Sequence, residues 1–478
     1  MKIEGYAPDL DPTTPGILTD CANFIPTLRG YEGAPSAQSI GVDALAAACV
    51  GAAVVNKLDD TTRLFAGTST KLYELSGTSW TDRSRGGNYT AGTDIRWCFT
   101  QFGDISLAVH KTDVLQYSTT GAFADLTAPK ATICETVGQF VFLFDTNEAT
   151  YGDSPNRWWC CAKGDYTNWV PSVPNECATG LLTSTAGPIK AGKRLGDNII
   201  AYKESAMFVG TYGGAAIWDF REVPGNAGAL GQYAVVNVGT PDNPMHIFMG
   251  RDDFYQFDGS RPVRLGAPVR ETVYAEINRT YSHLSVALHD PVEGRVFFFY
   301  CSTTSIIDKC VVYNYRTGKW GRDNRSIEMP IQYTNAGITY SSIGTYYATY
   351  ADLPAVSYDS TLLALRVQVP AVFDAAHTLK TLNGDSTSSY MTTGDIGDDQ
   401  MFSLLNRVNP RFITKPTSAT MTNFYRNASG DSLSTDQTVT MSESRFDVIR
   451  EARWHRLQFN FTGPVELNTF NPAIEVTG

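Results

Sequence analysis

The clearest structural signal is the segment Val311-Val312-Tyr313-Asn314-Tyr315-Arg316-Thr317-Gly318-Lys319-Trp320. An alternating apolar strand leads into a glycine-centred turn, and an aromatic residue opens the return strand, which is the pattern of a β-hairpin. Five earlier segments follow the same plan: Leu72–Leu75 with Gly77 and Trp80, Val114–Tyr117 with Gly121 and Phe123, Trp158–Trp159 with Gly164 and Trp169, Met207–Val209 with Gly213-Gly214 and Trp218, and Phe254–Phe257 with Gly259 and Val263.

The six hairpins recur at steps of 43, 46, 49, 45 and 57 residues along the chain, measured between the residues that open the return strands. Irregular hairpin repeats of about 40–50 residues are typical of a β-propeller, with one four-stranded blade per repeat. The sequence therefore predicts an all-β fold built on a six-bladed propeller. A seventh, degenerate blade near Tyr346–Tyr358 stays open as an alternative.

Composition agrees with this fold class. The 478 residues include 24 Tyr, 24 Phe, 8 Trp and 41 Gly, which favour strands and tight turns over helices. The chain is longer than a single core usually supports, but the blades of a propeller bury their faces only against their neighbours. The one segment that favours a helix is short and runs from Arg270 to Arg279, after Pro268.

The pattern divides the chain into three parts. Residues 1–40 are rich in proline and glycine and indicate an extended arm, whose Cys21, Phe24, Ile25 and Leu28 we expect to pack against the rest of the protein. Residues 41–355 carry the hairpins and form the propeller. In residues 356–478 the alternating strands Leu365–Val369 and Leu457–Phe461 predict a second, smaller β domain, completed by the arm.

Two polar stretches of that last part, Asn383–Gln400 and Asn427–Ser444, are dominated by Ser, Thr, Gly and Asp. They predict long loops, which are often functional surfaces.

The charge balance argues against a protein that grips nucleic acid. The net charge is −11, and no run of basic residues marks a surface for DNA or membrane. We expect no secretory leader, because the amino terminus has no apolar core, and no membrane span. Nine scattered cysteines, two of them adjacent at Cys160-Cys161, suggest reduced thiols in a protein made in the cytosol.

No motif predicts catalysis, so we expect no enzyme activity, no catalytic, cofactor-binding or metal site, and no cofactor. Gly187–Arg194 resembles a phosphate-binding loop, but Arg194 replaces the Ser or Thr that should ligate Mg²⁺, and the segment indicates instead a basic turn between blades. The adjacent carboxylates at 59–60, 252–253 and 398–399 are typical of solvated turns. Six histidines show no zinc-binding or nucleophile–base spacing: His110, His246, His283, His289, His377 and His455.

Three strings resemble a known family. They are Asp11–Pro26 followed by Arg29-Gly30-Tyr31 and Gly33-Ala34-Pro35, the hairpin Tyr313–Trp320, and Arg445–Val448 with Arg453–Arg456. Together they resemble the tail nozzle or tail-hub proteins of short-tailed bacteriophages, also called tail tubular protein B or head–tail stabilisation proteins.

The resemblance implies a structural virion protein of the tail, made in the cytoplasm of the host bacterium. It implies a propeller with an added β platform, and a homohexameric ring that extends the DNA channel below the portal and its adaptor protein. Such a ring retains the genome and passes double-stranded DNA during ejection without sequence-specific binding, and a tail needle, spikes or fibres can attach to it. A net negative charge suits a wall past which a polyanion must slide. In such a ring we expect the stretches Asn383–Gln400 and Asn427–Ser444 to form a channel constriction or contacts between neighbouring subunits.

Two alternatives stay open. A glycan-processing or glycan-binding propeller, like a sialidase or a depolymerase, is the first, although Leu75–Trp80 lacks the Asp of the sialidase box before its Gly. The second is a scaffold propeller of a cellular complex, which predicts a stable monomer.

Overall fold

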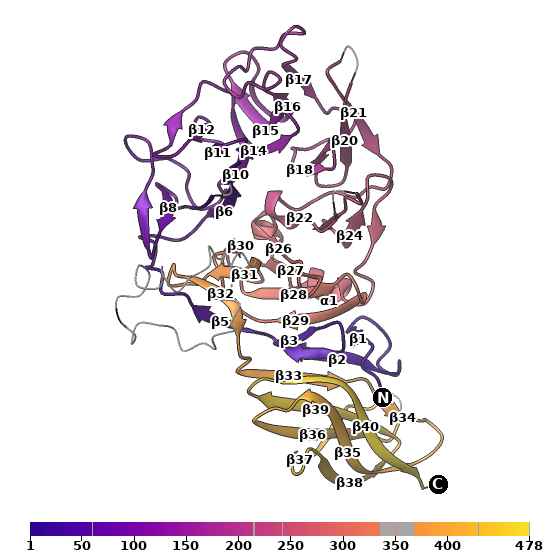
Figure 1. Ribbon diagram of the computed structural model, residues 1–478. Helices are drawn as coiled ribbons and strands as arrows, with labels where there is room; N and C mark the ends of the chain where they lie inside the picture. The colour runs from indigo at the N-terminus through magenta and orange to yellow at the C-terminus, as the bar shows by residue number, and fades with distance from the viewer. Residues whose placement is uncertain are drawn as a thin grey trace.

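The computed structural model describes residues 1–59, 61–213, 216–240, 242–334, 349, 368–428 and 430–477. Strands dominate, and the described helices are limited to α1 (Arg270–Glu276) and the 3₁₀ helices η1 (Gln232–Ala234) and η2 (Arg279–Leu284). Figure 1 shows a ring of small sheets with a second body of strands beneath it. The prediction of an all-β propeller with an added β domain is confirmed, as is the short helix after Pro268.

Six four-stranded antiparallel units follow one another along the chain, each with its strands in sequence order. They are β6 (Gly51–Asn56), β7 (Thr62–Gly67), β8 (Leu72–Ser76) and β9 (Ser79–Asp82); β10 (Cys98–Phe102), β11 (Ile105–Val109), β12 (Gln116–Ser118) and β13 (Ala124–Asp125); β14 (Lys130–Val137), β15 (Phe140–Glu148), β16 (Gly152–Cys160) and β17 (Ala178–Leu181); β18 (Ala191–Leu195), β19 (Asn198–Tyr202), β20 (Met207–Tyr212) and β21 (Trp218–Val223); β22 (Val235–Asn237), β23 (His246–Met249), β24 (Phe254–Phe257) and β25 (Val263–Arg264); and β26 (Val286–Asp290), β27 (Arg295–Tyr300), β28 (Lys309–Asn314) and β29 (Lys319–Asp323).

Each predicted hairpin supplies the outer part of one of these six blades. In five of them the predicted turn joins the third and fourth strands, as in the β28–β29 pair where Tyr313 lies opposite Trp320. The third blade differs, because its return strand β17 begins only at Ala178. Trp169, predicted to open that strand, instead lies in the connecting loop, where its carbonyl accepts a hydrogen bond from the indole of Trp159 at 3.0 Å.

A further four-stranded sheet closes the circle between the sixth blade and the first. It contains β30 (Met329–Thr334), β31 (Gln368–Phe373), β32 (Leu379–Gly384) and, as its outer strand, β5 (Ser36–Ser39) from the amino-terminal arm. The innermost strands β6, β10, β14, β18, β22, β26 and β30 each contact the next around the axis, and β30 contacts β6. The ring is thus closed by strands from both ends of the chain.

This closing sheet corrects the predicted boundary at 355/356. Strands β31 and β32 belong to the propeller, so the second β domain begins at β33 (Ser388–Thr393). Local alternation of apolar residues shows that a strand exists but not which sheet it joins, and this is the reason for the difference. The segment Tyr346–Tyr358, considered for a seventh blade, and Leu365 and Val367 lie outside the described residues.

The arm completes the second domain, as predicted. β1 (Gly5–Tyr6) and β2 (Ile17–Ala22) join a sheet with the order β1-β2-β33-β39-β36-β37, in which β34 also pairs with β39. β3 (Phe24–Pro26) and β4 (Tyr31–Gly33) link β29 of the sixth blade to β40, so one nine-stranded sheet runs from the propeller through the arm to β38. The remaining bounds are β34 (Ile396–Gly397), β35 (Ser403–Thr414), β36 (Ser418–Arg426), β37 (Ser434–Thr440), β38 (Phe446–Ala452), β39 (Trp454–Thr462) and β40 (Glu466–Val476).

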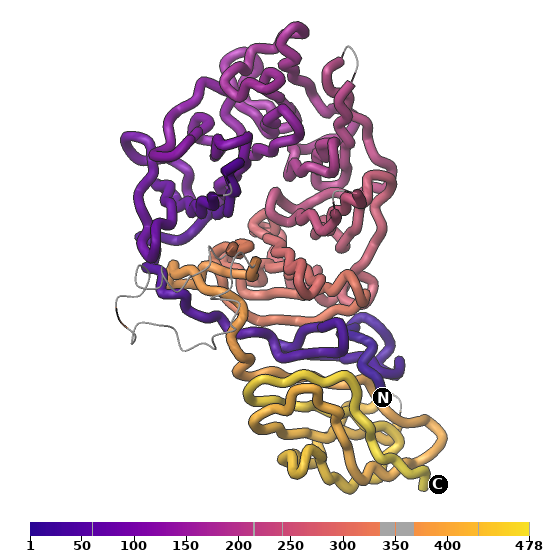
Figure 2. Tube along the Cα trace, in the orientation of Figure 1, coloured from indigo at the N-terminus to yellow at the C-terminus, as the bar shows by residue number. Residues whose placement is uncertain are grey.

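The two sheets of the second domain share one apolar core that continues into the sixth blade. Phe24 of the arm, Phe459 of β39 and Phe446 of β38 belong to it, together with Phe298 and Trp320 of the blade. Figure 2 shows the arm lying between the propeller and the second domain. Because an apolar core and a hydrogen-bonded sheet both cross this junction, the two parts form one rigid unit.

Two details of the sequence prediction need correction. The stretches Asn383–Gln400 and Asn427–Ser444 are not continuous loops, because they contain β33, β34 and β37. Strands made of small polar residues have the composition of loops, so composition alone does not separate the two. In the arm, Cys21, Phe24 and Ile25 are buried as expected, but Leu28 is 50% exposed in the turn between β3 and β4.

Candidate functional site

Two hollows lie at the axis of the propeller, and Tyr233 belongs to the lining of each. Tyr233 lies in η1, between two cavities of about 380 Å³ and 460 Å³, and lines both of them. Its phenol donates a hydrogen bond to the carbonyl oxygen of Trp97. The neighbouring Gln232 both donates to and accepts from the backbone of Gly192 on β18, at 3.1 and 2.8 Å. These hydrogen bonds hold η1 against the connection before the second blade and against the fourth blade.

The approach of η1 to the axis depends on Gly231. A Cβ atom at this position would lie 2.5 Å from the carbonyl oxygen of His283, which is much closer than real Cβ contacts. The absent side chain allows the backbone to pass close to the start of the sixth blade. The sequence contains no periodic signal for this segment, so neither Tyr233 nor Gln232 was predicted.

The first cavity carries charged groups from four blades. Lys111 pairs with Asp145 at 2.7 Å and with Asp153 at 2.9 Å, so its charge is neutralised locally. His283 lies 3.1 Å from a carboxylate oxygen of Asp94. This pairing accounts for all the acidic side chains that line the cavity.

Arg96 and Lys190 complete the set of cations in this cavity. The guanidinium of Arg96 donates to the carbonyl oxygens of Leu284 at 3.0 Å and Glu328 at 3.2 Å. These bonds connect the second blade with the sixth blade and with the closing sheet. Burial lowers the pKa of Arg96 from its ordinary value, because desolvation disfavours the charged form.

The second cavity opens on the other side of Tyr233, among the innermost strands. Glu135 of β14 lies 3.8 Å from Lys193 of β18, and burial raises the pKa of the Glu135 carboxyl group. His289 of β26 is also partly buried there, and desolvation lowers its pKa to about 4. Its Nε2 lies 3.1 Å from the hydroxyl of Tyr315, so the ring is held in the wall of the cavity.

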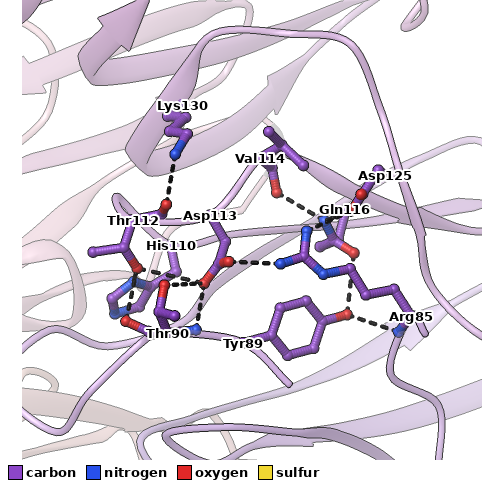
Figure 3. Close-up of polar contacts among 10 residues, drawn as sticks. All are labelled: Arg85, Tyr89, Thr90, His110, Thr112, Asp113, Val114, Gln116, Asp125 and Lys130. Atoms are coloured by element: carbon purple, nitrogen blue, oxygen red, sulfur yellow. Dashed lines mark hydrogen bonds and ion pairs between the residues drawn. The ribbon is translucent and has the colours of Figure 1, made fainter. Parts of the chain in front are cut away.

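A dense polar cluster lies where the first blade meets the second (Figure 3). The carboxylate of Asp113 accepts hydrogen bonds from the backbone and hydroxyl of Thr90 and from Arg85 at 2.8 Å. Arg85 also bonds Asp125 at 2.7 Å, and Gln116 connects Asp125 to the hydroxyl of Tyr89. Each of these groups is satisfied by another, so the cluster holds the 83–97 connection against the second blade.

The sequence candidates for chemistry occupy structural positions. Gly187–Arg194 runs from the loop after β17 directly into β18, with no helix whose N-terminus could bind phosphate, and so is the predicted connection between blades. His246 is fully buried between the hydroxyl of Tyr202 at 2.7 Å and the carbonyl of Arg194 at 2.8 Å. Among the described residues, no group of three or more His, Cys, Asp or Glu side chains could hold a metal ion.

One pair of adjacent carboxylates departs from the expectation of a solvated turn. Asp253 is 1% exposed, and its carboxylate accepts hydrogen bonds from the backbone N–H groups of Phe254 at 2.7 Å and Gly266 at 3.0 Å. It fixes the start of β24 against the segment that precedes α1. Asp60 of another pair lies outside the described residues.

The nine cysteines are all unpaired and buried. Cys98 and Cys134 come closest, with their sulfur atoms 3.8 Å apart on the innermost strands of neighbouring blades. Burial raises the pKa of the Cys49 thiol to about 12. A thiol of this kind is protonated and unreactive at neutral pH, so it is no nucleophile.

Comparison with known proteins leaves the function open. No family model and no curated protein sequence matches the chain. Among solved structures, the chain is similar to YCF48 bound to D1 peptide, with 10% identity and a TM-score of 0.38 over 76% of this chain and 98% of the other. It is also similar to YCF48 from Cyanidioschyzon merolae, with 10% identity and a TM-score of 0.36 over 73% and 98%. TM-scores this low support no argument about the fold or the function of this chain.

The described residues contain no helix that is long and apolar enough to cross a membrane.

Proposed function

We propose that this chain is a structural virion protein of a short-tailed bacteriophage. In this proposal six copies form a tail nozzle or hub ring, which extends the DNA channel below the portal and its adaptor protein. The ring retains the packaged genome and passes it during ejection, and it is the surface on which a tail needle, spike or fibre can attach.

The observation that carries this proposal is where the three family-like strings lie. The arm string supplies β2 and β3, the hairpin Tyr313–Trp320 joins β28 to β29, and the carboxyl-terminal string supplies parts of β38 and β39. Strands β28, β29, β3 and β38 belong to one nine-stranded sheet. Segments more than a hundred residues apart thus meet in one structural unit, which unrelated chance strings have no reason to do.

The rigidity of that unit also supports a structural role. Arg322 of β29 holds both carboxylate oxygens of Glu276 in α1, at 2.7 and 2.9 Å, and Arg295 of β27 contacts Glu32 of β4 at 2.6 Å. A subunit that transmits force between a capsid and a tail benefits from a fixed angle between its parts. Tyr233 lines both hollows at the propeller axis. In this proposal the DNA therefore passes through the centre of the ring of subunits and not through a propeller.

Closure of such a ring requires a heterologous contact, in which one face of a subunit meets a different face of the next. Strand β37 is the best candidate for one side of this contact. It is the last strand of its sheet, and five of its seven residues are exposed. A bare strand edge offers backbone N–H and C=O groups to a strand or loop of a neighbour. The whole chain carries a net charge of −11, and a ring of six such chains disfavours adhesion of DNA.

Location in the virion tests this function directly. We would fuse an epitope tag to the carboxyl terminus and apply immunogold labelling to purified particles. In a second experiment, particles from a strain in which the gene is deleted would be examined for DNA retention and infectivity. We expect gold at the tail vertex, and we expect the deletion particles to package DNA and then lose it. Gold distributed over the capsid, or deletion particles that keep their DNA and infect normally, would overturn the proposal.

A further inference from the structure

A second hollow lies beside the first axial cavity and continues it into a groove. This hollow has a volume of about 480 Å³, and both hollows are lined by Asp94, Arg96 and Leu284. The axial cavity extends toward Ile189 and Lys190, which precede β18. The second hollow extends toward Ile307 and Ile327, beside the sixth blade and the closing sheet. We call the combined feature the Arg96 groove.

The walls of the Arg96 groove are largely apolar. Ile95, Ile189 and Leu230 line one half, and Ile307 and Ile327 line the other. Ile306, also in the second half, is 57% exposed at its edge. Apolar walls with a few charged groups are typical of sites that hold a ligand in a defined orientation.

Two cations in the groove lack a carboxylate partner. Arg96 donates only to backbone carbonyls and the sulfur of Met329, and its buried Nε has no acceptor among the described residues. No described carboxylate lies within ion-pair distance of Arg96 or Lys190. The acidic groups of the groove have other partners: Asp145 pairs with Lys111, Asp94 with His283, and Glu328 with His377 at 2.6 Å. A partly buried positive charge without a counter-ion is costly, and an incoming anion relieves that cost.

We propose that the Arg96 groove binds an extended peptide segment of a partner protein, in which apolar residues flank a carboxylate. The carboxylate would lie between Arg96 and Lys190, and the apolar side chains would pack on the two halves of the groove. The positive charge at the centre and the apolar walls on either side match these two parts of the peptide. This inference goes beyond the ring proposed above and does not depend on it.

Selection of peptides from a random library tests the proposal and does not require the partner to be identified first. The full chain is immobilised and panned against a displayed library of random twelve-residue peptides, and the enriched peptides are synthesised with a fluorescent label. Affinity is then measured by fluorescence anisotropy for the wild-type chain and for Lys190→Glu, Lys190→Met and, as a matched exposed lysine outside the groove, Lys415→Glu. Lys190 is used because Arg96 also joins three sheets, so its removal would disturb the fold.

We expect enriched peptides to contain Asp or Glu between apolar residues. Because Lys190→Glu replaces a charge-assisted contact by repulsion, it should weaken binding roughly tenfold or more. Lys190→Met, which only removes the contact, should weaken binding less, and Lys415→Glu should leave binding unchanged. Replacing the acidic residue of the peptide by its amide should weaken binding at least as much as Lys190→Met, because the carboxylate charge would then be lost to both Arg96 and Lys190. Failure to enrich any peptide, enrichment of peptides without an acidic residue, or equal binding by Lys190→Glu would overturn the proposal. Because the assay reads binding by a monomer or a ring, its failure is distinguishable from failure of ring assembly.

Discussion

Tyr31 of the amino-terminal arm donates the hydrogen of its phenol to the carbonyl oxygen of Trp320 at 2.5 Å, although 289 residues separate them. The phenol oxygen of Tyr31 in turn accepts a hydrogen bond from the backbone N–H of Tyr6 at 3.2 Å, and both tyrosine side chains are buried. This one hydroxyl therefore joins two strands of the arm to the sixth blade.

Removal of that hydroxyl should weaken the junction. We expect Tyr31→Phe to lower the free energy of unfolding by about 1–3 kcal/mol, because the N–H of Tyr6 and the carbonyl of Trp320 would lose this buried partner. Chemical denaturation measures the change. Tyr151→Phe, at a half-exposed tyrosine, is the control and should be nearly neutral. Equal stability of the two variants would contradict this view of the junction.

The ion pair between Arg295 and Glu32 should be more sensitive than ion pairs at the surface. Arg295 is 6% exposed and also faces Asp290 at 3.6 Å, so Arg295→Met would leave acidic groups buried without a counter-charge. We expect a loss of roughly 2–4 kcal/mol in unfolding free energy. Arg251→Met, which breaks an exposed pair with Glu204, should cost about 1 kcal/mol or less. Similar losses in both variants, measured in one denaturation series, would argue against a buried connection.

Acidification should destabilise the protein through its buried histidines. Burial lowers the pKa of His246 to about 4, whereas an unfolded chain has a histidine pKa near 6.5. Between these values the unfolded state binds more protons, so stability is present above pH 6.5 and is lost as the pH falls toward 4. Between pH 7 and pH 5, His246 alone should lower the free energy of unfolding by on the order of 1–2 kcal/mol. Denaturation curves at the two pH values should show a smaller pH dependence in His246→Gln, and an unchanged dependence would count against the buried neutral ring.

The edge of β37 should control assembly without controlling folding. Thr435 and Gln437 are exposed on this last strand, and lysine at both positions would disfavour pairing with another chain. We expect Thr435→Lys with Gln437→Lys to retain the wild-type circular dichroism spectrum and melting temperature but to remain monomeric by size-exclusion chromatography. A double variant that still assembles would move the subunit contact to another surface.

The local part of the fold could be predicted from the sequence because a hairpin is specified by neighbouring residues. Gly318 adopts a positive φ of 71° in the turn between Tyr313 and Trp320, and such a turn can be inferred from the glycine and its flanking strands. The closing sheet could not be predicted in this way. Its outer strand β5 pairs Ala37 with Leu382, and no local pattern indicates a partner so far along the chain.

The candidate site was beyond the reach of sequence patterns for the same reason. Arg96, Lys190 and Tyr233 are single residues on separate connections, and only the closed circle of blades brings them around one axis. The resemblance to tail-hub proteins led to a proposed function but not to these residues, because that family has no catalytic motif to transfer.

The measurement that tests the central claim most directly is negative-stain electron microscopy with mass photometry on the purified chain, alone and mixed with the proteins encoded beside it. A nozzle subunit should form six-fold rings with a central hole, and their mass should be six times the 52.3 kDa of one chain, plus any bound adaptor. A chain that stays monomeric under all these conditions would contradict the nozzle assignment and would favour a scaffold propeller or one that binds glycans.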